Sequence, residues 1–185
     1  MAVRERYCAF KAIRWFGKGG IKMDQREIKI RMFKPGDASY ISYLHAQLYK
    51  EEYEFKAIFE YYVMKGLAEF IHNPDDGQLW VAEIEGKIIA SIAIVKAEDN
   101  TAQLRWFLVV KEYQELGIGK RLIKTALDFC RQNKYGKVFL WTTDNLHQAH
   151  YLYEANGFKL VESKENTEWS DYVLFEERWD LTLND

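Results

Sequence analysis

The chain has 185 residues, a net charge of −2, and 48% hydrophobic residues. This length and apolar content predict one folded domain with a substantial core and exclude a disordered chain. The near-neutral charge gives no electrostatic argument for nucleic-acid binding. The sequence has two distant cysteines, Cys8 and Cys130, and four scattered histidines, which form no metal-binding or redox motif. We therefore expect no bound metal and a cytoplasmic protein.

The first 24 residues differ from the rest of the sequence. They are rich in Lys and Arg, and Phe10, Ile13 and Phe16 are spaced to share a helical face. One interpretation is a basic arm for a membrane surface or nucleic acid; the favoured one is an appended leader of little importance to the activity. Charges interrupt each apolar run, so neither a cleaved signal peptide nor a membrane span is expected. We predict a leader over 1–24 and one domain over 25–185.

After this leader, strand and helix patterns alternate with turn residues between them. A strand pattern stops at Pro35-Gly36, and Asp37 or Ser39 is expected to cap the helix that follows. The apolar spacing predicts, in order, a strand over 28–32, helices from 37 and over 55–71, strands over 79–84, 87–95 and 102–110, a helix over 117–133, a strand over 137–142, a helix over 146–156 closed by Gly157, and strands over 158–161 and 172–183.

This order of elements predicts an α/β fold with a mixed, mostly antiparallel central sheet and about four flanking helices. The strands from 79 to 110 form an antiparallel meander, and the helix over 117–133 then joins a parallel pair by a right-handed crossover. If that pair is parallel, both carboxyl ends face the same way. The loop before the helix then lies at the mouth of the sheet, where ligands of such folds bind.

The segment Gln114-x-x-Gly117-x-Gly119 forms this loop and opens the helix. Amide N–H groups at a helix start have no intrahelical partner, and glycines leave room for an anion to approach them. Lys120 and Arg121 add cationic side chains near the same place. The segment therefore predicts a pyrophosphate site, and the alternative is that the glycines only shape the turn.

Together with Leu152-Tyr153-Glu154-Ala155-Asn156-Gly157-Phe158 and the element order, this turn resembles the GNAT superfamily of N-acetyltransferases over roughly residues 27–183. The resemblance implies the GNAT-like acyl-CoA N-acyltransferase fold, in which the parallel pair splays apart, and acetyl-CoA as co-substrate. It also implies that backbone amides of the loop bind the pyrophosphate and that the preceding strand end pairs with the pantetheine arm. Carried over by motif, the cofactor-binding residues are Leu108, Val109, Val110, Gln114, Glu115, Leu116, Gly117, Ile118, Gly119 and Lys120.

Tyr153 is the residue expected to carry proton chemistry, because the family's tyrosine at this place can donate a proton to the departing thiolate. The alternative is a buried tyrosine that only packs. Many family members have Asn seven residues earlier, contacting the cofactor, where this chain has Leu146. Asn145 is the substitute for that contact, although capping of the next helix, together with Asp144, is the favoured interpretation.

The general base is not identified by the sequence. Many relatives have a glutamate on the strand before the glycine loop, where this chain has Gln103 and Arg105. The glutamates at 51, 52 and 54 lie between the first two helices, near the expected acceptor cleft, but a solvated charge cluster is favoured for them. Trp106 and Trp141 are cleft walls or core residues, and core is favoured because both lie inside strands. For His147 and His150, a satisfied or solvated side chain is favoured.

These observations predict an N-acetyltransferase that moves acetyl from acetyl-CoA to a primary amine of a small molecule or peptide. Direct transfer in a ternary complex is expected, because Cys130 lies on the core face of its helix and offers no acyl-enzyme. Two alternatives stay open: a non-catalytic acyl-CoA-binding sensor on the same fold, and a nucleotide-binding module, which the short glycine turn disfavours. No nucleic-acid or membrane partner is expected, and the acceptor and a homodimer are left open.

Overall fold

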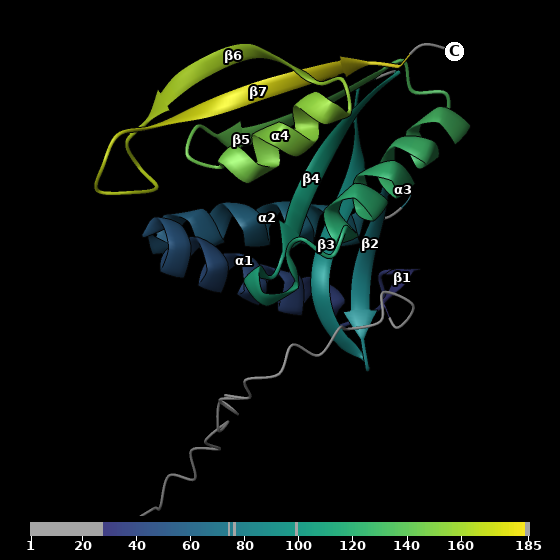
Figure 1. Cartoon of the computed structure of the whole chain (residues 1–185), viewed down its shortest axis with the longest axis horizontal. Coiled ribbons are helices and arrows are strands. Elements are labelled where there is room, and N and C mark those ends of the chain that lie inside the picture. Colours follow the sequence, from purple (N-terminus) through teal and green to yellow (C-terminus); the bar gives the residue numbers. More distant parts are fainter. Residues whose placement is uncertain (1–27, 74, 76, 99, 184–185) are drawn as a thin grey trace, which may run out of the picture.

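The computed structural model describes residues 28–73, 75, 77–98 and 100–183, so the predicted leader over 1–24 lies outside the described residues (Figure 1). The predicted order of elements is confirmed, and the largest difference is a longer strand β6. The elements are β1 (Lys29–Met32), α1 (Asp37–Tyr53), α2 (Ala57–His72), β2 (Gly77–Ile84), β3 (Lys87–Glu98), β4 (Thr101–Val109), the short 3₁₀ turn η3 (Lys111–Tyr113), α3 (Ile118–Gln132), β5 (Lys137–Thr143), α4 (His147–Ala155), β6 (Lys159–Asn166) and β7 (Leu174–Thr182).

The strands form one seven-stranded sheet in the order β1-β2-β3-β4-β5-β7-β6. Among the pairings of the described strands, β4 with β5 is parallel and the others are antiparallel, which confirms the predicted fold class. The parallel register runs from Thr101 opposite Lys137 to Leu104 opposite Leu140. Both strands continue beyond that point without a further pair between them in the described register, so the predicted splay is present.

Two apolar cores lie on opposite faces of the sheet, as the alternation along β2 shows. Leu79 and Val81 pack into the core under α1 and α2, whereas Trp80 and Ala82 pack into the core under α3 and α4. The same division of helices between the two faces is seen in Figure 1. The predicted apolar face of α3 is confirmed, because Ile118, Leu122, Ile123, Ala126, Leu127 and Cys130 are all buried.

The predicted cap of α1 by Asp37 or Ser39 is wrong. The N-cap residue is Gly36, with a φ of 96°, and no side chain caps the helix. The Asp37 carboxylate instead accepts a hydrogen bond from the Lys34 amide at 2.8 Å and pairs with the Arg31 guanidinium at 2.5 Å. The Asp37 carboxylate binds the guanidinium of Arg31 and not the first amides of α1, because a hydrogen bond between two charged groups is stronger than one to a neutral amide. This ion pair holds β1 against the start of α1.

Candidate active site

A β-bulge lies in β4 where it separates from β5. The register with β3 shifts there, so that Trp106 and Phe107 together lie opposite Ile92. Trp106 has a φ of 45°, which is unusual for a residue with a bulky side chain, and its carbonyl accepts a hydrogen bond from Ser91 Oγ at 2.7 Å. A bulge bends a strand and redirects its side chains, so this one contributes to the separation of β4 from β5.

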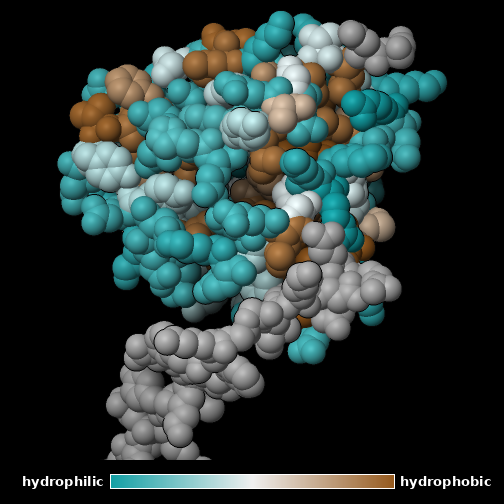
Figure 2. Space-filling model, viewed as in Figure 1, coloured by the Kyte–Doolittle hydropathy of each residue, from teal (hydrophilic) through white to brown (hydrophobic). Residues whose placement is uncertain are grey.

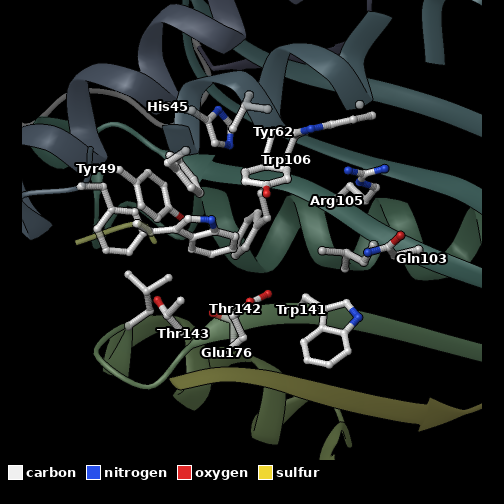
Figure 3. A pocket seen from close by; sticks show the side chains of 18 of the residues that line it. His45, Tyr49, Tyr62, Gln103, Arg105, Trp106, Trp141, Thr142, Thr143 and Glu176 are labelled. Carbon is white, nitrogen blue, oxygen red and sulfur yellow. The ribbon is translucent and has the colours of Figure 1, made fainter. Parts of the chain in front are cut away.

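Two cavities lie on either side of this separation. The larger, of about 530 Å³, is lined by residues of α1, α2, the middle of β4, β5 and the β6–β7 hairpin (Figure 3). The smaller, of about 390 Å³, lies between the end of β4, the start of α3 and α4, where a recess bordered by apolar residues is seen in Figure 2. Four residues line both cavities: Tyr49, Phe107, Leu146 and Tyr153. The two cavities therefore meet at these side chains.

The smaller cavity collects most of the residues predicted to bind a cofactor. Its wall contains Leu108, Val109, Gln114, Glu115, Gly117, Ile118, Gly119 and Lys120. Three further predicted residues, Val110, Leu116 and Asn145, are not in this wall. The Val110 amide donates to the Ile89 carbonyl at 2.9 Å, Leu116 packs against the core, and Asn145 precedes Leu146, the N-cap residue of α4. The Gln114 side chain joins the turn to the strand, because its Nε2 donates to the Val109 carbonyl at 3.1 Å.

Glycine occupies the two positions at the start of α3 for different structural reasons. Gly117 is the N-cap residue with a φ of 74°, and a Cβ added to it would meet no atom within 4 Å. A Cβ on Gly119 would stand 3.1 Å from Leu152 Cδ1 and 3.3 Å from Phe107 Cζ, so this glycine lets α3 approach α4 and β4 closely. No side chain caps α3, and its first amides remain available to an anion.

Of the two cations predicted near this helix start, one is in place. Lys120 is exposed and lines the smaller cavity. The expectation for Arg121 is wrong, because its Nη2 donates to the Ile28 carbonyl at 3.1 Å and ties α3 to the residue before β1. A long side chain next to a helix start can reach either neighbour, and the sequence alone does not decide which.

Tyr153 is held at the junction of the cavities by both its backbone and its ring. Its carbonyl accepts the Phe158 amide at 3.1 Å, and the Gly157 amide donates to the Glu154 carbonyl at 2.9 Å, which is a Schellman motif with Gly157 at a φ of 87°. This confirms Gly157 as the C′ residue of α4, and it explains why the segment from Leu152 to Phe158 has a glycine at this position. Tyr153 is 5% exposed, and the centroid of its ring lies 6.2 Å from that of Phe107. Burial, reinforced by the Tyr49 phenol, raises the pKa of Tyr153.

His45 is a polar residue of this site that the sequence analysis did not single out. It is buried on α1, lines the larger cavity, and stacks on Tyr49 at 6.0 Å between ring centroids. Its Nδ1 lies 2.9 Å from the Ile41 carbonyl, which only accepts, so Nδ1 carries the proton and Nε2 carries a lone pair. Burial lowers the pKa of His45 to about 4, so the ring is neutral at pH 7. In the sequence, this position was indicated by the spacing of four residues from His45 to both Ile41 and Tyr49, which places the three side chains on one face of a helix.

Asn145 and Asp144 do not cap α4, which corrects the favoured prediction. The N-cap residue is Leu146, with no side-chain cap. Asn145 Oδ1 accepts from Thr143 Oγ1 at 2.7 Å, and its Nδ2 donates to Tyr172 Oη at 3.1 Å. Asp144 accepts the amide of Phe175 at 3.0 Å. Both side chains therefore fasten the β5–α4 loop to the β6–β7 hairpin, contacts that depend on residues distant in sequence.

The remaining predicted residues separate into wall, core and surface. Trp106 is buried in the core as predicted, and it also lines the larger cavity. The core prediction is wrong for Trp141, which is half-buried in the wall of that cavity, with Lys164 Nζ 4.5 Å from its ring centroid. Glu52 pairs with Lys111 at 2.7 Å, in agreement with a charge cluster. The Thr142 hydroxyl, in the wall of the larger cavity, has no hydrogen-bond partner among the described residues.

The described part of the chain has neither a cluster of metal-binding side chains nor a helix that could cross a membrane. The described residues contain no group of three or more His, Cys, Asp or Glu side chains arranged to hold a metal ion. Within the same residues, no helix combines the length and the apolar character that crossing a membrane requires.

The fold is therefore a mixed sheet with a bulged, splayed parallel pair of strands and an uncapped helix start beside that pair. A GNAT acetyltransferase of Staphylococcus aureus Mu50 shares this fold, with a TM-score of 0.71 and 20% identity over 85% of this chain and 99% of that chain. A Bacillus anthracis protein named for streptothricin acetylation, solved in complex with acetyl coenzyme A, has a TM-score of 0.54 and 26% identity over 63% of this chain and 68% of that one.

The sequence comparisons identify the family. The family model for the acetyltransferase (GNAT) family matches residues 42–158, so the chain belongs to the GNAT family. An N-acetylaspartate synthetase of Xenopus tropicalis is 35% identical over 99 residues, which are 53% of this chain and 36% of that protein. The chain spans about a third of the length of the curated relatives it matches.

Proposed function

We propose that this chain transfers the acetyl group of acetyl-CoA to the amine of a small molecule or peptide, by direct transfer in a complex that holds both substrates. The observation that carries the proposal is the meeting of two cavities at Tyr49, Phe107, Leu146 and Tyr153. One cavity has an uncapped helix start in its wall, which suits a pyrophosphate. The other is large enough for an acceptor, and the two substrates would meet where the parallel strands separate.

The coenzyme would occupy the smaller cavity. Amides from Gly117 to Lys120 would bind the pyrophosphate, with the Lys120 ammonium adding charge, and the β4 end at Leu108 and Val109 would pair with the pantetheine arm as an added strand does. An amide N–H of the same strand end would stabilise negative charge on the thioester oxygen during attack. The aromatic wall at Phe107 would cover the reacting carbonyl.

Transfer forms a C–N bond and breaks the C–S bond, so the departing thiolate needs a proton. Tyr153 would supply it, because its phenol is protonated at neutral pH and its hydroxyl makes no hydrogen bond to another described residue. The proton that the attacking amine loses would pass through water to the tyrosinate left by this step, which restores the phenol. His45 would accept a hydrogen bond at Nε2 from the amine or from an intervening water. A ring with a pKa near 4 is a weak base, so its part is to orient the nucleophile rather than to store the proton.

Calorimetry with acetyl-CoA tests the coenzyme site. Lys120→Glu reverses a charge at the start of α3, and we expect the dissociation constant to rise about tenfold, because the change removes an attraction to the pyrophosphate and adds a repulsion, each of up to about 1 kcal/mol for exposed charges. Lys124→Glu is the matched control, since Lys124 is exposed one turn later on the same helix and is not in the cavity wall. Equal affinity in the two variants would contradict the assignment.

Turnover is tested by thiol release over a panel of amines that includes amino acids, polyamines, aminoglycosides and peptide N-termini. L-Aspartate belongs in the panel, because several relatives are named N-acetylaspartate synthetase. We expect an acetylated product, confirmed by mass spectrometry, for at least one amine. Tight acetyl-CoA binding without turnover of any amine would instead favour a sensor on this fold.

A further inference from the structure

The larger cavity contains a cationic side chain, Arg105, whose surroundings are unusual. It is half-buried on β4, immediately after the last residue that pairs with β5. Its guanidinium lies 4.7 Å from the ring centroid of Trp106 and against α2 at Gly66, where an added Cβ would stand 2.6 Å from Nη2. The absence of a side chain at Gly66 thus makes room for the guanidinium, which is held between an indole and a helix backbone.

Among the residues that the structure describes, the Arg105 guanidinium has no anionic partner in contact. Within the described residues, no carboxylate lies within 4.0 Å of the guanidinium nitrogens, and the Arg105 side chain makes no hydrogen bond. Glu69, one turn after Gly66 and exposed on α2, acts on it only through the longer-range field, and burial lowers the pKa of Arg105. A guanidinium removed from water without a paired carboxylate is costly, which points to a ligand anion as the missing partner.

The charges around the cavity agree with one missing anion. Three cationic side chains line it, Lys65, Arg105 and Lys164, against two carboxylates, Glu69 and Glu176. Glu176 is already engaged, because it lies 3.7 Å from Lys164 Nζ and accepts from Asn166 at 2.9 Å. One positive charge is therefore left over, and Arg105 is the least exposed of the three cations.

The position of Arg105 relative to the reaction centre is suited to a small bifunctional molecule. Arg105 lies with Gln103 and Trp141 toward one end of the cavity, whereas His45 and Tyr49 lie toward the other, where the second cavity joins (Figure 3). A ligand that spans the cavity would place one end at the guanidinium and the other at the junction. We propose that Arg105 binds a carboxylate of the acceptor, so that the substrates are amines that carry a carboxylate, such as amino acids.

This inference rests on the proposed acetyl transfer, and it adds a chemical class of acceptor and a residue that selects it. A guanidinium presents paired N–H donors that match the two oxygens of a carboxylate, which an ammonium does not. Charge-assisted hydrogen bonds in a desolvated site change binding by about 10- to 100-fold. Arg105 would therefore discriminate an amino acid from its neutral amide by a factor of that size.

The experiment compares amino acids with their amides as acceptors. The probes are L-aspartate, L-glutamate and glycine, each paired with the corresponding fully amidated compound, at saturating acetyl-CoA. For the preferred amino acid, we expect kcat/KM to exceed that of its amide by about 10- to 100-fold in the unmodified protein. Arg105→Met should remove most of this preference while the amide's own kcat/KM changes by no more than about threefold. Comparing the preference between proteins cancels the difference in amine basicity between the two probes.

Two further variants separate the carboxylate contact from general effects. Arg131→Met, on the exposed face of α3, removes the same charge away from the cavity and should leave the preference unchanged. Arg105→Lys keeps the charge but loses the paired donors and should restore only part of the preference. If Arg105→Met unfolds, Arg105→Gln replaces it in the same comparison.

The outcomes separate this inference from the proposed function. Turnover with a preference for amides, or a carboxylate preference that Arg105→Met does not change, would overturn the role of Arg105 and leave acetyl transfer standing. If no probe is acetylated, the same probes are titrated by calorimetry into protein saturated with coenzyme A. Carboxylate-dependent binding that Arg105→Met weakens would still support the inference, and its absence would overturn it.

Discussion

Replacing Tyr153 with Phe removes the one hydroxyl proposed to protonate the thiolate and keeps the aromatic ring. The ring contacts at 6.2 Å with Phe107, 5.9 Å with Phe158 and 6.3 Å with Trp179 are retained. The hydroxyl makes no hydrogen bond to another described residue, so its loss should change the free energy of unfolding by less than about 1 kcal/mol. A general-acid contribution should instead appear as a fall of about 100-fold in the chemical step.

Single-turnover acetylation with rapid quenching measures this step, since it separates chemistry from product release. Acetyl-CoA affinity and the urea midpoint are measured on the same samples. Tyr151→Phe is the matched control, because Tyr151 is 75% exposed two positions away and should show wild-type rates. A Tyr153→Phe variant that turns over at the wild-type rate would refute the assignment, and a loss of stability with normal turnover would identify a tyrosine that only packs.

Two further predictions concern stability. The pKa of His45 is lowered from 6.5 to about 4, so between these pH values the unfolded state binds more protons than the folded state. The free energy of unfolding therefore falls as the pH falls, and urea unfolding should show a loss of about 2 kcal/mol between pH 7 and 5 from this group. His45→Gln should abolish this loss. An equally steep acid limb in the Gln variant would show that other groups cause it. Gly157→Ala should lower the free energy of unfolding by about 1–2 kcal/mol, because a side chain at a φ of 87° is strained and its Cβ would stand 3.3 Å from Leu181 Cδ1. An unchanged thermal midpoint would contradict this prediction.

The sequence by itself determined the features that depend on neighbouring residues. The apolar spacing of α3, the turn at Gly117, the C′ glycine at Gly157 and the order of strands and helices all follow from local periodicity and backbone preference. These were enough to place the parallel crossover and the loop beside it, and hence the smaller cavity. The same locality explains the wrong caps at Asp37 and Asn145, because each side chain had a stronger partner that lies elsewhere in the fold.

Only the tertiary structure decided which side chains line the larger cavity. His45 comes from α1, Arg105 from β4 and Trp141 from β5, and they surround one space because a bulge at Trp106 and the end of pairing at Leu104 hold the strands apart. Packing between elements far apart in the chain buries His45, which keeps its ring neutral, and desolvates the Arg105 guanidinium, which has no carboxylate in contact among the described residues. Desolvation and the lack of a partner are properties of that packing, so no local pattern in the sequence contains them.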